Sequence, residues 1–253
     1  MAKLSQTLSE LSGQVAIVTG SSKGIGRAIA ERLAQHGSRV VLSSRTPSDC
    51  QALAEEVNAR HGEERAIWTR CDAGDRADLA VLIKTAMERW GRIDTVVGNA
   101  LVSGDATAFI ERFDEESSIV FVSSSSGIAA LADYLGYGTS KAALNHLART
   151  LAVQLGPHNI RVNAVAPGIV ASNGPDAWGT AEEQRIGVGK TPLWRLGTPD
   201  EIASCVVWLA SPGGAFATGG VFLVDGGQSL KGMDGPHELR KLRRAQAGRR
   251  RPL

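Results

Sequence analysis

The chain has 253 residues, of which 43% are hydrophobic, which is enough for one folded domain with a sizeable core. Residues 229–253 hold eight Lys and Arg against two acidic residues, so the net charge of +2 leaves the rest of the chain mildly acidic. This argues against a nucleic-acid-binding fold, whose positive charge would cover the folded surface.

The three cysteines are widely spaced and form no C-x-x-C pair, which argues against a disulfide framework and a zinc site. The five histidines show no ligand spacing, so we expect no bound metal. The N-terminus has no apolar signal-peptide core, and no run of about 18 apolar residues occurs. We therefore expect a soluble, cytoplasmic protein that binds neither nucleic acids nor membranes.

Strands and helices are expected to alternate along residues 12–228. An apolar run at 15–18 leads into a glycine-rich turn, after which Ile29, Leu33 and Ala34 recur at helical spacing. The same alternation continues to residue 224. It predicts strands at 15–18, 39–43, 66–70, 95–97, 119–122, 161–166 and 221–224, and helices at 27–35, 49–61, 76–90, 137–155 and 199–210, the last entered through Thr198 as its N-cap.

This alternation is typical of an α/β fold with a parallel sheet. We predict a single domain over residues 12–228 with a Rossmann-type doubly wound sheet. Residues 1–11 would be an N-terminal extension, and residues 229–253 a basic C-terminal tail. The tail could bind an acidic partner, a nucleic acid or a membrane surface, but a solvated extension is the simpler interpretation.

A glycine turn follows the first strand and opens the first helix, where a dinucleotide needs it. Backbone N–H groups and the helix dipole would meet a pyrophosphate there, and glycine allows the close approach. A tight turn without a ligand is the alternative interpretation of the glycines alone. The turn predicts cofactor contacts from Gly20, Ser22, Lys23, Gly24, Ile25 and Gly26.

The second strand ends in Ser44 and Arg45, where a site for NAD(H) would have a carboxylate to accept from the ribose 2′-hydroxyl. Instead, Arg45 and Lys23 bring positive charge, and a guanidinium pairs well with a 2′-phosphate. We therefore expect NADP(H) as the preferred cofactor, with NAD(H) as the alternative. The competing interpretation is that both cations are ordinary solvated surface residues.

Three residues form a candidate catalytic set. Ser124 follows the fifth strand, where ligands gather in open α/β sheets. Tyr137 and Lys141 are four residues apart at the start of a helix and so share one face. An adjacent ammonium favours the phenolate form of a tyrosine, which makes it a useful acid/base near neutral pH.

With these motifs in this order, the chain resembles the short-chain dehydrogenase/reductases over most of residues 12–228. The resemblance rests on the glycine turn, Asn99-Ala100, Ser124, Tyr137-x-x-x-Lys141, Pro167-Gly168 and the run Val224-Asp225-Gly226-Gly227. It implies an oxidoreductase that interconverts an alcohol and a carbonyl by hydride transfer. It also implies a homo-oligomer, either a dimer or a tetramer.

The resemblance also assigns roles to residues. Tyr137 would be the general acid/base, Ser124 would hold the substrate oxygen, and Lys141 would lower the tyrosine pKa and bind the nicotinamide ribose. Tyr137 is also expected to contact the cofactor. The remaining cofactor contacts would come from Asp72 and Ala73 at the adenine, from Asn99 and Ala100, and from Pro167, Gly168, Val170 and Ser172 at the nicotinamide.

The chain departs from the family between the fourth and fifth strands. Only 24 residues separate Asn99 from Ser124, about half the usual number, so the crossover has no room for the family's long helix and its catalytic asparagine. Two interpretations remain. The protein is a working reductase with a shortened crossover, or it is a non-catalytic scaffold or regulator that binds the cofactor. The sequence does not identify the small-molecule substrate or the direction of reaction.

Overall fold

The computed structural model describes residues 10–100, 116–129, 135–171, 180 and 187–230. Its centre is a seven-stranded parallel sheet in the order β3-β2-β1-β4-β5-β6-β7. The strands are β1 Val15–Thr19, β2 Arg39–Ser44, β3 Ala66–Arg70, β4 Thr95–Gly98, β5 Ser118–Val122, β6 Arg161–Pro167 and β7 Val221–Val224. The α/β class and the doubly wound parallel sheet are confirmed.

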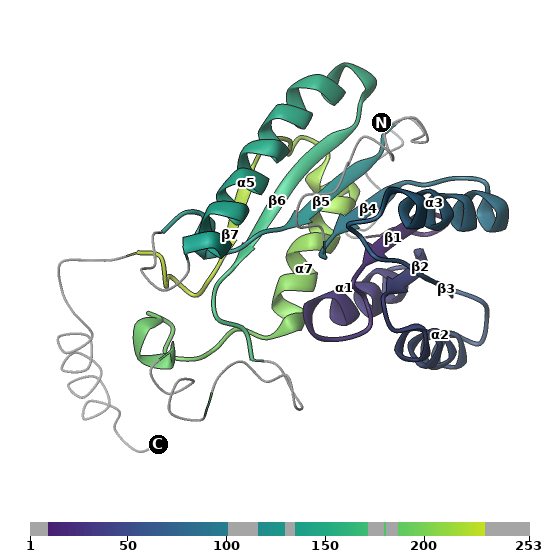
Figure 1. Cartoon of the computed structure of the whole chain (residues 1–253), viewed down its shortest axis with the longest axis horizontal. Helices are drawn as coiled ribbons and strands as arrows, with labels where there is room; N and C mark the ends of the chain where they lie inside the picture. The colour runs from purple at the N-terminus through teal and green to yellow at the C-terminus, as the bar shows by residue number, and fades with distance from the viewer. Residues whose placement is uncertain (1–9, 101–115, 130–134, 172–179, 181–186, 231–253) are drawn as a thin grey trace, which may run out of the picture.

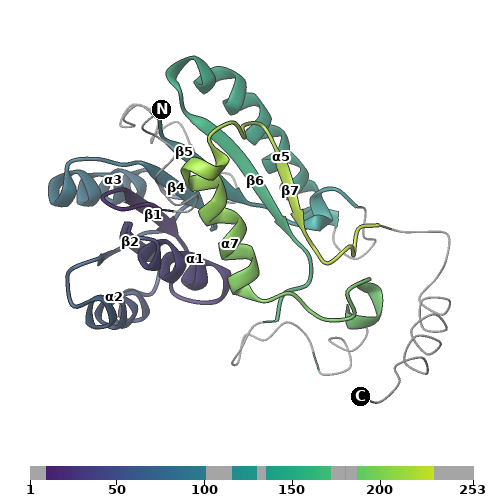
Figure 2. The ribbon, with the colours of Figure 1, turned by 180° about the vertical axis from the view of Figure 1, so that it is seen from behind.

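Helices cover both faces of this sheet (Figures 1 and 2). The α-helices are α1 Gly24–Gln35, α2 Pro47–His61, α3 Arg76–Trp90, α5 Leu135–Leu155 and α7 Pro199–Ala210, with short 3-10 turns at η2 Ser125–Gly127, η4 Gly156–His158 and η5 Pro212–Gly214. Helices α1, α2 and α7 pack on one face, and α3 and α5 pack on the other. None of the helices in the described part of the chain is long and apolar enough to cross a membrane.

The apolar strands explain this layered arrangement. In β1 and β5 every residue is buried, as expected for parallel strands with helices on both faces. Alternate residues then enter different cores: Val18 and Val120 pack with α1 and α7, whereas Ile119 and Phe121 pack with α5. The core begins at Leu11, which is 1% exposed although it falls within the expected N-terminal extension.

The shortened crossover still returns the chain to a parallel strand beside β4. Thr95 pairs with Ser118 and Gly98 with Phe121 in parallel register. Residues 101–115, which contain most of the crossover, lie outside the described residues. The strand order reverses between β1 and β4, and the carboxyl ends of such strands are where ligands bind in open α/β sheets.

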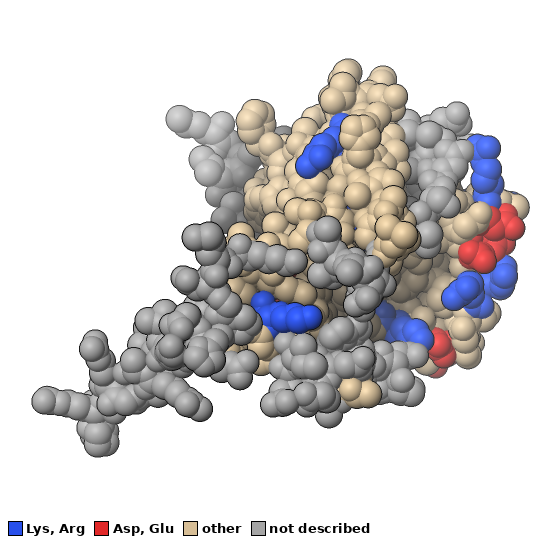
Figure 3. Space-filling view, turned by 60° about the vertical axis from the view of Figure 1, so that its left-hand side comes forward, with Lys and Arg blue, Asp and Glu red and all other residues tan. Residues whose placement is uncertain are grey.

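Helix α5 carries large apolar side chains that are open to solvent in the single chain. Leu135 is 83% exposed and Val153 79% exposed. In the view of Figure 3 the described surface is mostly uncharged, and Lys, Arg, Asp and Glu gather mainly towards one edge. Large apolar side chains this exposed are uncommon on a single folded chain, and contiguous apolar surface commonly marks an interaction site.

Candidate active site and cofactor cleft

The glycine turn joins β1 to α1 at the carboxyl edge of the sheet. Gly20 has φ +64° and Gly24 has φ +57°, a backbone region that side chains with a Cβ disfavour. At Gly26 a Cβ would overlap the carbonyl oxygen of Gly20. The turn therefore folds tightly against the start of the helix, and glycine at these positions lets a pyrophosphate approach the backbone closely.

Two polar side chains join this turn to the end of β4 by hydrogen bonds. Thr19 Oγ1 accepts hydrogen bonds from the backbone N–H of Asn99 at 3.1 Å and of Ala100 at 3.2 Å. The Asn99 side chain donates to the Gly20 carbonyl at 3.1 Å. The Asn99 amide is thus engaged in holding the turn, so its contribution to the site is the shape of the cleft.

A cleft of about 530 Å³ opens at this edge and gathers most of the predicted adenosine-side residues. Its lining includes the predicted Gly20, Ser22, Lys23, Ser44, Arg45, Asp72, Ala73, Asn99 and Ala100. It also includes Thr46, Asp49, Cys71 and Gly74, which the sequence analysis missed. Gly24, Ile25 and Gly26 belong to the adjoining turn and the first turn of α1. The structure therefore brings four separate segments of sequence into one cleft.

The polar side chains of the cleft differ in whether they already form hydrogen bonds or ion pairs within the protein. The Ser44 hydroxyl donates to the Thr46 carbonyl at 2.8 Å and accepts from Cys50 Sγ at 3.3 Å, so its hydrogen bonds are internal. Arg45 is exposed and forms no ion pair with any described residue. Asp72 Oδ1 accepts from the backbone N–H of Gly74 at 3.0 Å. Of these groups, the Arg45 guanidinium is the one available to an anionic ligand.

The Tyr137–Lys141 pair lies on the first turns of α5. Lys141 Nζ is 5.7 Å from the centroid of the Tyr137 ring and donates to the Val122 carbonyl at 3.0 Å. Burial lowers the pKa of the Lys141 ammonium from its ordinary value, because a desolvated cation is disfavoured. The same desolvation strengthens the field of the ammonium at the neighbouring phenol.

Ser124 follows β5, as predicted, and is 8% exposed. It is the N-cap of η2, and its Oγ accepts from the backbone N–H of Ser126 at 3.1 Å. The Ser123 hydroxyl donates to the Lys141 carbonyl at 3.2 Å, which ties this turn to α5. Ser124 Oγ has no other hydrogen-bond partner among the described residues, so its proton can be donated to a substrate oxygen.

Asn145, one turn beyond Lys141, supports the same junction. It is 4% exposed, and its Nδ2 donates to the Gly127 carbonyl of η2 at 3.3 Å. Gly127 is required there because a Cβ would lie 2.7 Å from the Lys141 carbonyl carbon. The serine turn and the Tyr–Lys helix are therefore packed backbone against backbone.

The predicted nicotinamide segment follows β6. Pro167 ends the strand, and the Gly168 N–H donates to the Val224 carbonyl at 3.1 Å. A Cβ at Gly168 would lie 2.7 Å from Asp225 Cα, so the close approach of the two segments requires glycine. Val170 pairs with Gly197 in an isolated bridge. Ser172 lies outside the described residues.

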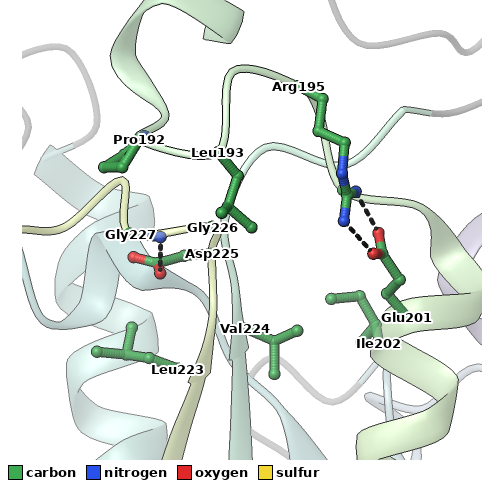
Figure 4. A pocket seen from close by; sticks show the side chains of 11 residues that line it. Pro192, Leu193, Arg195, Glu201, Ile202, Leu223, Val224, Asp225, Gly226 and Gly227 are labelled. Carbon is green, nitrogen blue, oxygen red and sulfur yellow. Dashed lines mark hydrogen bonds and ion pairs between the residues drawn. The ribbon is translucent and has the colours of Figure 1, made fainter. Parts of the chain in front are cut away.

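A second pocket, of about 450 Å³, lies between the start of α7 and the end of β7 and shares no lining residue with the cofactor cleft. Figure 4 shows Arg195 and Glu201 facing each other across its wall, joined by two hydrogen bonds. The Arg195 hydrogen bonds lower the pKa of Glu201 to about 2. The Asp225 carboxylate accepts from the N–H groups of Gly227 and Ser229. These charged groups are satisfied within the protein, which favours a structural role.

The residues at the carboxyl edge fit a dinucleotide: a glycine-rich turn for the pyrophosphate, a cleft beside β2 and β3 for the adenosine, and a Tyr–Lys pair farther along the sheet. Among the described residues there is no group of three or more His, Cys, Asp or Glu that could hold a metal ion. The fold and the cleft define the class, a Rossmann-type dinucleotide-binding protein.

Comparison with known proteins identifies the family. A short-chain dehydrogenase family model matches residues 14–117, and a model described as enoyl-(acyl carrier protein) reductase matches residues 102–229. An uncharacterized oxidoreductase of Mycobacterium tuberculosis is 36% identical, with 89% of this chain and 96% of the relative covered. The L-rhamnose 1-dehydrogenase (NAD(P)(+)) of Azotobacter vinelandii is 34% identical, with 83% and 94% covered.

Among solved structures, a 7α-hydroxysteroid dehydrogenase in complex with NADH and a 7-oxo bile acid conjugate has a TM-score of 0.77 and 29% identity. The match covers 88% of this chain and 98% of that one. The chain belongs to the short-chain dehydrogenase/reductase family. It is therefore an oxidoreductase of the kind that acts on CH–OH and C=O groups with NAD(P)(H).

Proposed function

We propose that the protein is an NADP(H)-dependent oxidoreductase that interconverts an alcohol and a carbonyl, with Tyr137 as the general acid/base. The observation that carries this proposal is the Lys141 ammonium 5.7 Å from the Tyr137 ring centroid, beside the serine turn that follows β5. A cytoplasmic location and a homo-oligomeric assembly stay predictions.

Each member of the catalytic set has a distinct task. In reduction, Tyr137 donates its phenolic proton to the oxygen of the substrate carbonyl, and in oxidation its phenolate removes the proton of the alcohol. Ser124 donates a hydrogen bond to the same oxygen and fixes its position. Lys141 stabilises the phenolate electrostatically. A bound nicotinamide supplies or accepts the hydride.

The preference for NADP(H) is supported by the charge beside β2. The strand ends in Ser44, whose hydroxyl is engaged with Thr46, and no carboxylate takes that position. Arg45 follows with an exposed guanidinium that faces the cleft and pairs with no described residue. A guanidinium that is already free and solvated can form a bidentate pair with a 2′-phosphate without first breaking an ion pair.

The test begins with fluorescence titration of NADPH and NADH, followed by turnover of a panel of simple ketones at saturating cofactor. Tyr137→Phe should lower kcat by about 100-fold or more, the usual contribution of a general acid/base, and should leave the affinity for NADPH nearly unchanged. The matched control is Tyr134→Phe at the chain's other tyrosine, which should retain turnover.

Either of two outcomes would contradict the proposal. Tight NADPH binding without turnover on a broad panel would favour the non-catalytic scaffold. Tighter binding of NADH than of NADPH would remove the proposed cofactor preference and leave the catalytic assignment standing.

A further inference from the structure

The cofactor cleft is lined by equal numbers of positive and negative side chains. The residues at the end of β2 alone would suggest a positively charged site. Its lining contains two cations, Lys23 and Arg45, and two carboxylates, Asp49 and Asp72. The expected preference for NADP(H) rests on the two cations alone. A site with balanced charge does not automatically prefer the more highly charged cofactor.

The two carboxylates differ in how they are held. Asp72 accepts a 3.0 Å hydrogen bond from the N–H of Gly74, in its own loop. Asp49 is exposed, and among the described residues its carboxylate accepts one long hydrogen bond, 3.4 Å from Ser48 Oγ. Asp49 is therefore the more exposed and less restrained of the two carboxylates, and the freer to approach a ligand in the cleft.

Asp49 and Arg45 are four residues apart and lie on adjoining segments of the chain. Arg45 directly follows β2, and Asp49 is the third residue of α2, which begins at Pro47. Both residues line the same cleft, as does Thr46 between them. An acidic residue in the first turn of a helix also interacts favourably with the helix dipole, so a purely structural role is the alternative that the test must separate.

We propose that Asp49 is a specificity-determining residue that opposes Arg45 and restrains the preference for a 2′-phosphate. This inference rests on the proposed function of the cleft. A 2′-phosphate is an anion that Arg45 attracts and Asp49 repels, whereas an unphosphorylated ribose offers hydroxyl donors that a carboxylate accepts. Removing the Asp49 charge therefore favours the phosphorylated cofactor, and removing the Arg45 charge favours the other.

The test measures binding of adenosine fragments, without turnover. Isothermal titration calorimetry compares 2′,5′-ADP with ADP on the full chain, for the wild type and for Asp49→Asn. We expect the affinity ratio of 2′,5′-ADP to ADP to rise about fivefold in Asp49→Asn, as for removal of one solvent-exposed charge interaction. The same ratio should be seen with NADPH and NADH by fluorescence titration.

The matched control is Glu55→Gln, which removes an exposed carboxylate from the same helix outside the cofactor cleft. It should leave the ratio unchanged. The effect of Asp49→Asn should also shrink in 0.5 M salt, where the Debye length is only about 4 Å. A residue that only stabilises α2 would change the melting temperature and leave both the ratio and its salt dependence unmoved.

The outcomes separate this inference from the proposed function. Binding of the fragments with an unchanged ratio in Asp49→Asn, or an equal shift in Glu55→Gln, overturns the role of Asp49 alone. If the wild type binds none of 2′,5′-ADP, ADP, NADPH and NADH, the proposed function of the cleft is wrong and the role of Asp49 falls with it. Asp49→Ser provides a second neutral variant should Asp49→Asn fold poorly.

Discussion

Gly26 shows how single residues set the geometry of the cofactor cleft. Its Cβ position overlaps the Gly20 carbonyl oxygen and lies 2.7 Å from Asn99 Nδ2, so a methyl group there would push apart the turn and the end of β4. The hydrogen bond from Asn99 to Gly20 would be lost with that displacement. The added methyl group would meet the Gly20 backbone and the hydrogen-bonded Asn99 side chain, and moving either of them would cost packing energy.

We therefore predict that Gly26→Ala weakens NADPH binding by about 100-fold, or about 2.7 kcal/mol, which is within the range for losing a hydrogen bond to a charged phosphate. Fluorescence titration measures the effect. Gly189→Ala is the control, because a Cβ at Gly189 meets nothing within 4 Å, and it should bind NADPH like the wild type. Unchanged affinity in Gly26→Ala would mean that the ligand does not contact this turn.

The sequence predicts the positions of residues in recognisable motifs better than those of residues that only line the surface of the cleft. Tyr137, Lys141 and Arg45 are found where their spacing places them, because helical periodicity and strand ends fix local position. Cys71 and Asp49 were missed because their place in the cleft depends on the register of β2 with β3 and on the angle of α2. The hydrogen bond between the Ser44 hydroxyl and Cys50 could not be predicted from the sequence either, since Cys50 lies in the next element.

At the scale of elements, helix α7 begins with a capping box. Thr198, predicted as the N-cap, accepts from the Glu201 N–H, and the Glu201 carboxylate accepts from the Thr198 N–H at 2.8 Å. Arg195 adds two further hydrogen bonds to this carboxylate. These interactions favour the ionised form and lower the pKa of Glu201 to about 2, from an ordinary value of 4.5.

This shift predicts a pH dependence of stability with a definite sign. Because the folded-state pKa lies below the unfolded value, the unfolded chain binds more protons at low pH. The stabilisation is therefore fully present above pH 4.5 and is lost as the pH falls towards 2. We expect Glu201→Gln to melt below the wild type at pH 7, and the difference to shrink below pH 4.5.

Thermal unfolding of both proteins across this pH range measures the effect. Glu88→Gln is a suitable control, since its pair with Lys84 joins two well-exposed side chains on α3 and exposed pairs of this kind contribute little. A difference between wild type and Glu201→Gln that stays constant down to pH 3 would contradict the prediction.

The strand bounds predicted from the sequence lie close to the observed ones, but three helices begin earlier than predicted. Helix α1 begins at Gly24 where the apolar pattern starts at Arg27, α2 begins at Pro47 where Asp49 was expected, and α5 begins at Leu135 where Tyr137 was expected. The first turn of a helix is too short to show an apolar repeat of its own. Glycine or proline in that turn is easily taken for a sign that no helix has begun. Proline is nevertheless favourable at the first helical position, as in α2.

At the scale of the whole molecule, the cofactor cleft depends on the order of the strands. Its lining comes from the segments after β1, β2, β3 and β4, which are neighbours only because the sheet order is β3-β2-β1-β4. The alternating pattern predicts a parallel sheet, but the side-by-side order of strands is a long-range property that no local pattern contains. An unfolded chain lacks the cleft altogether.

Cofactor binding should therefore stabilise the folded chain as a unit. A ligand that binds only the folded state at 100 times its Kd adds about 2.7 kcal/mol, which for a protein of this size raises Tm by about 5 to 10 °C. We predict such a rise for the wild type with NADPH, measured by thermal unfolding with the concentration set from the fluorescence titration. At the same NADPH concentration Gly26→Ala should show almost no rise, because its cleft is disturbed. An equal rise in both proteins would mean that NADPH binds at a place other than the turn after β1.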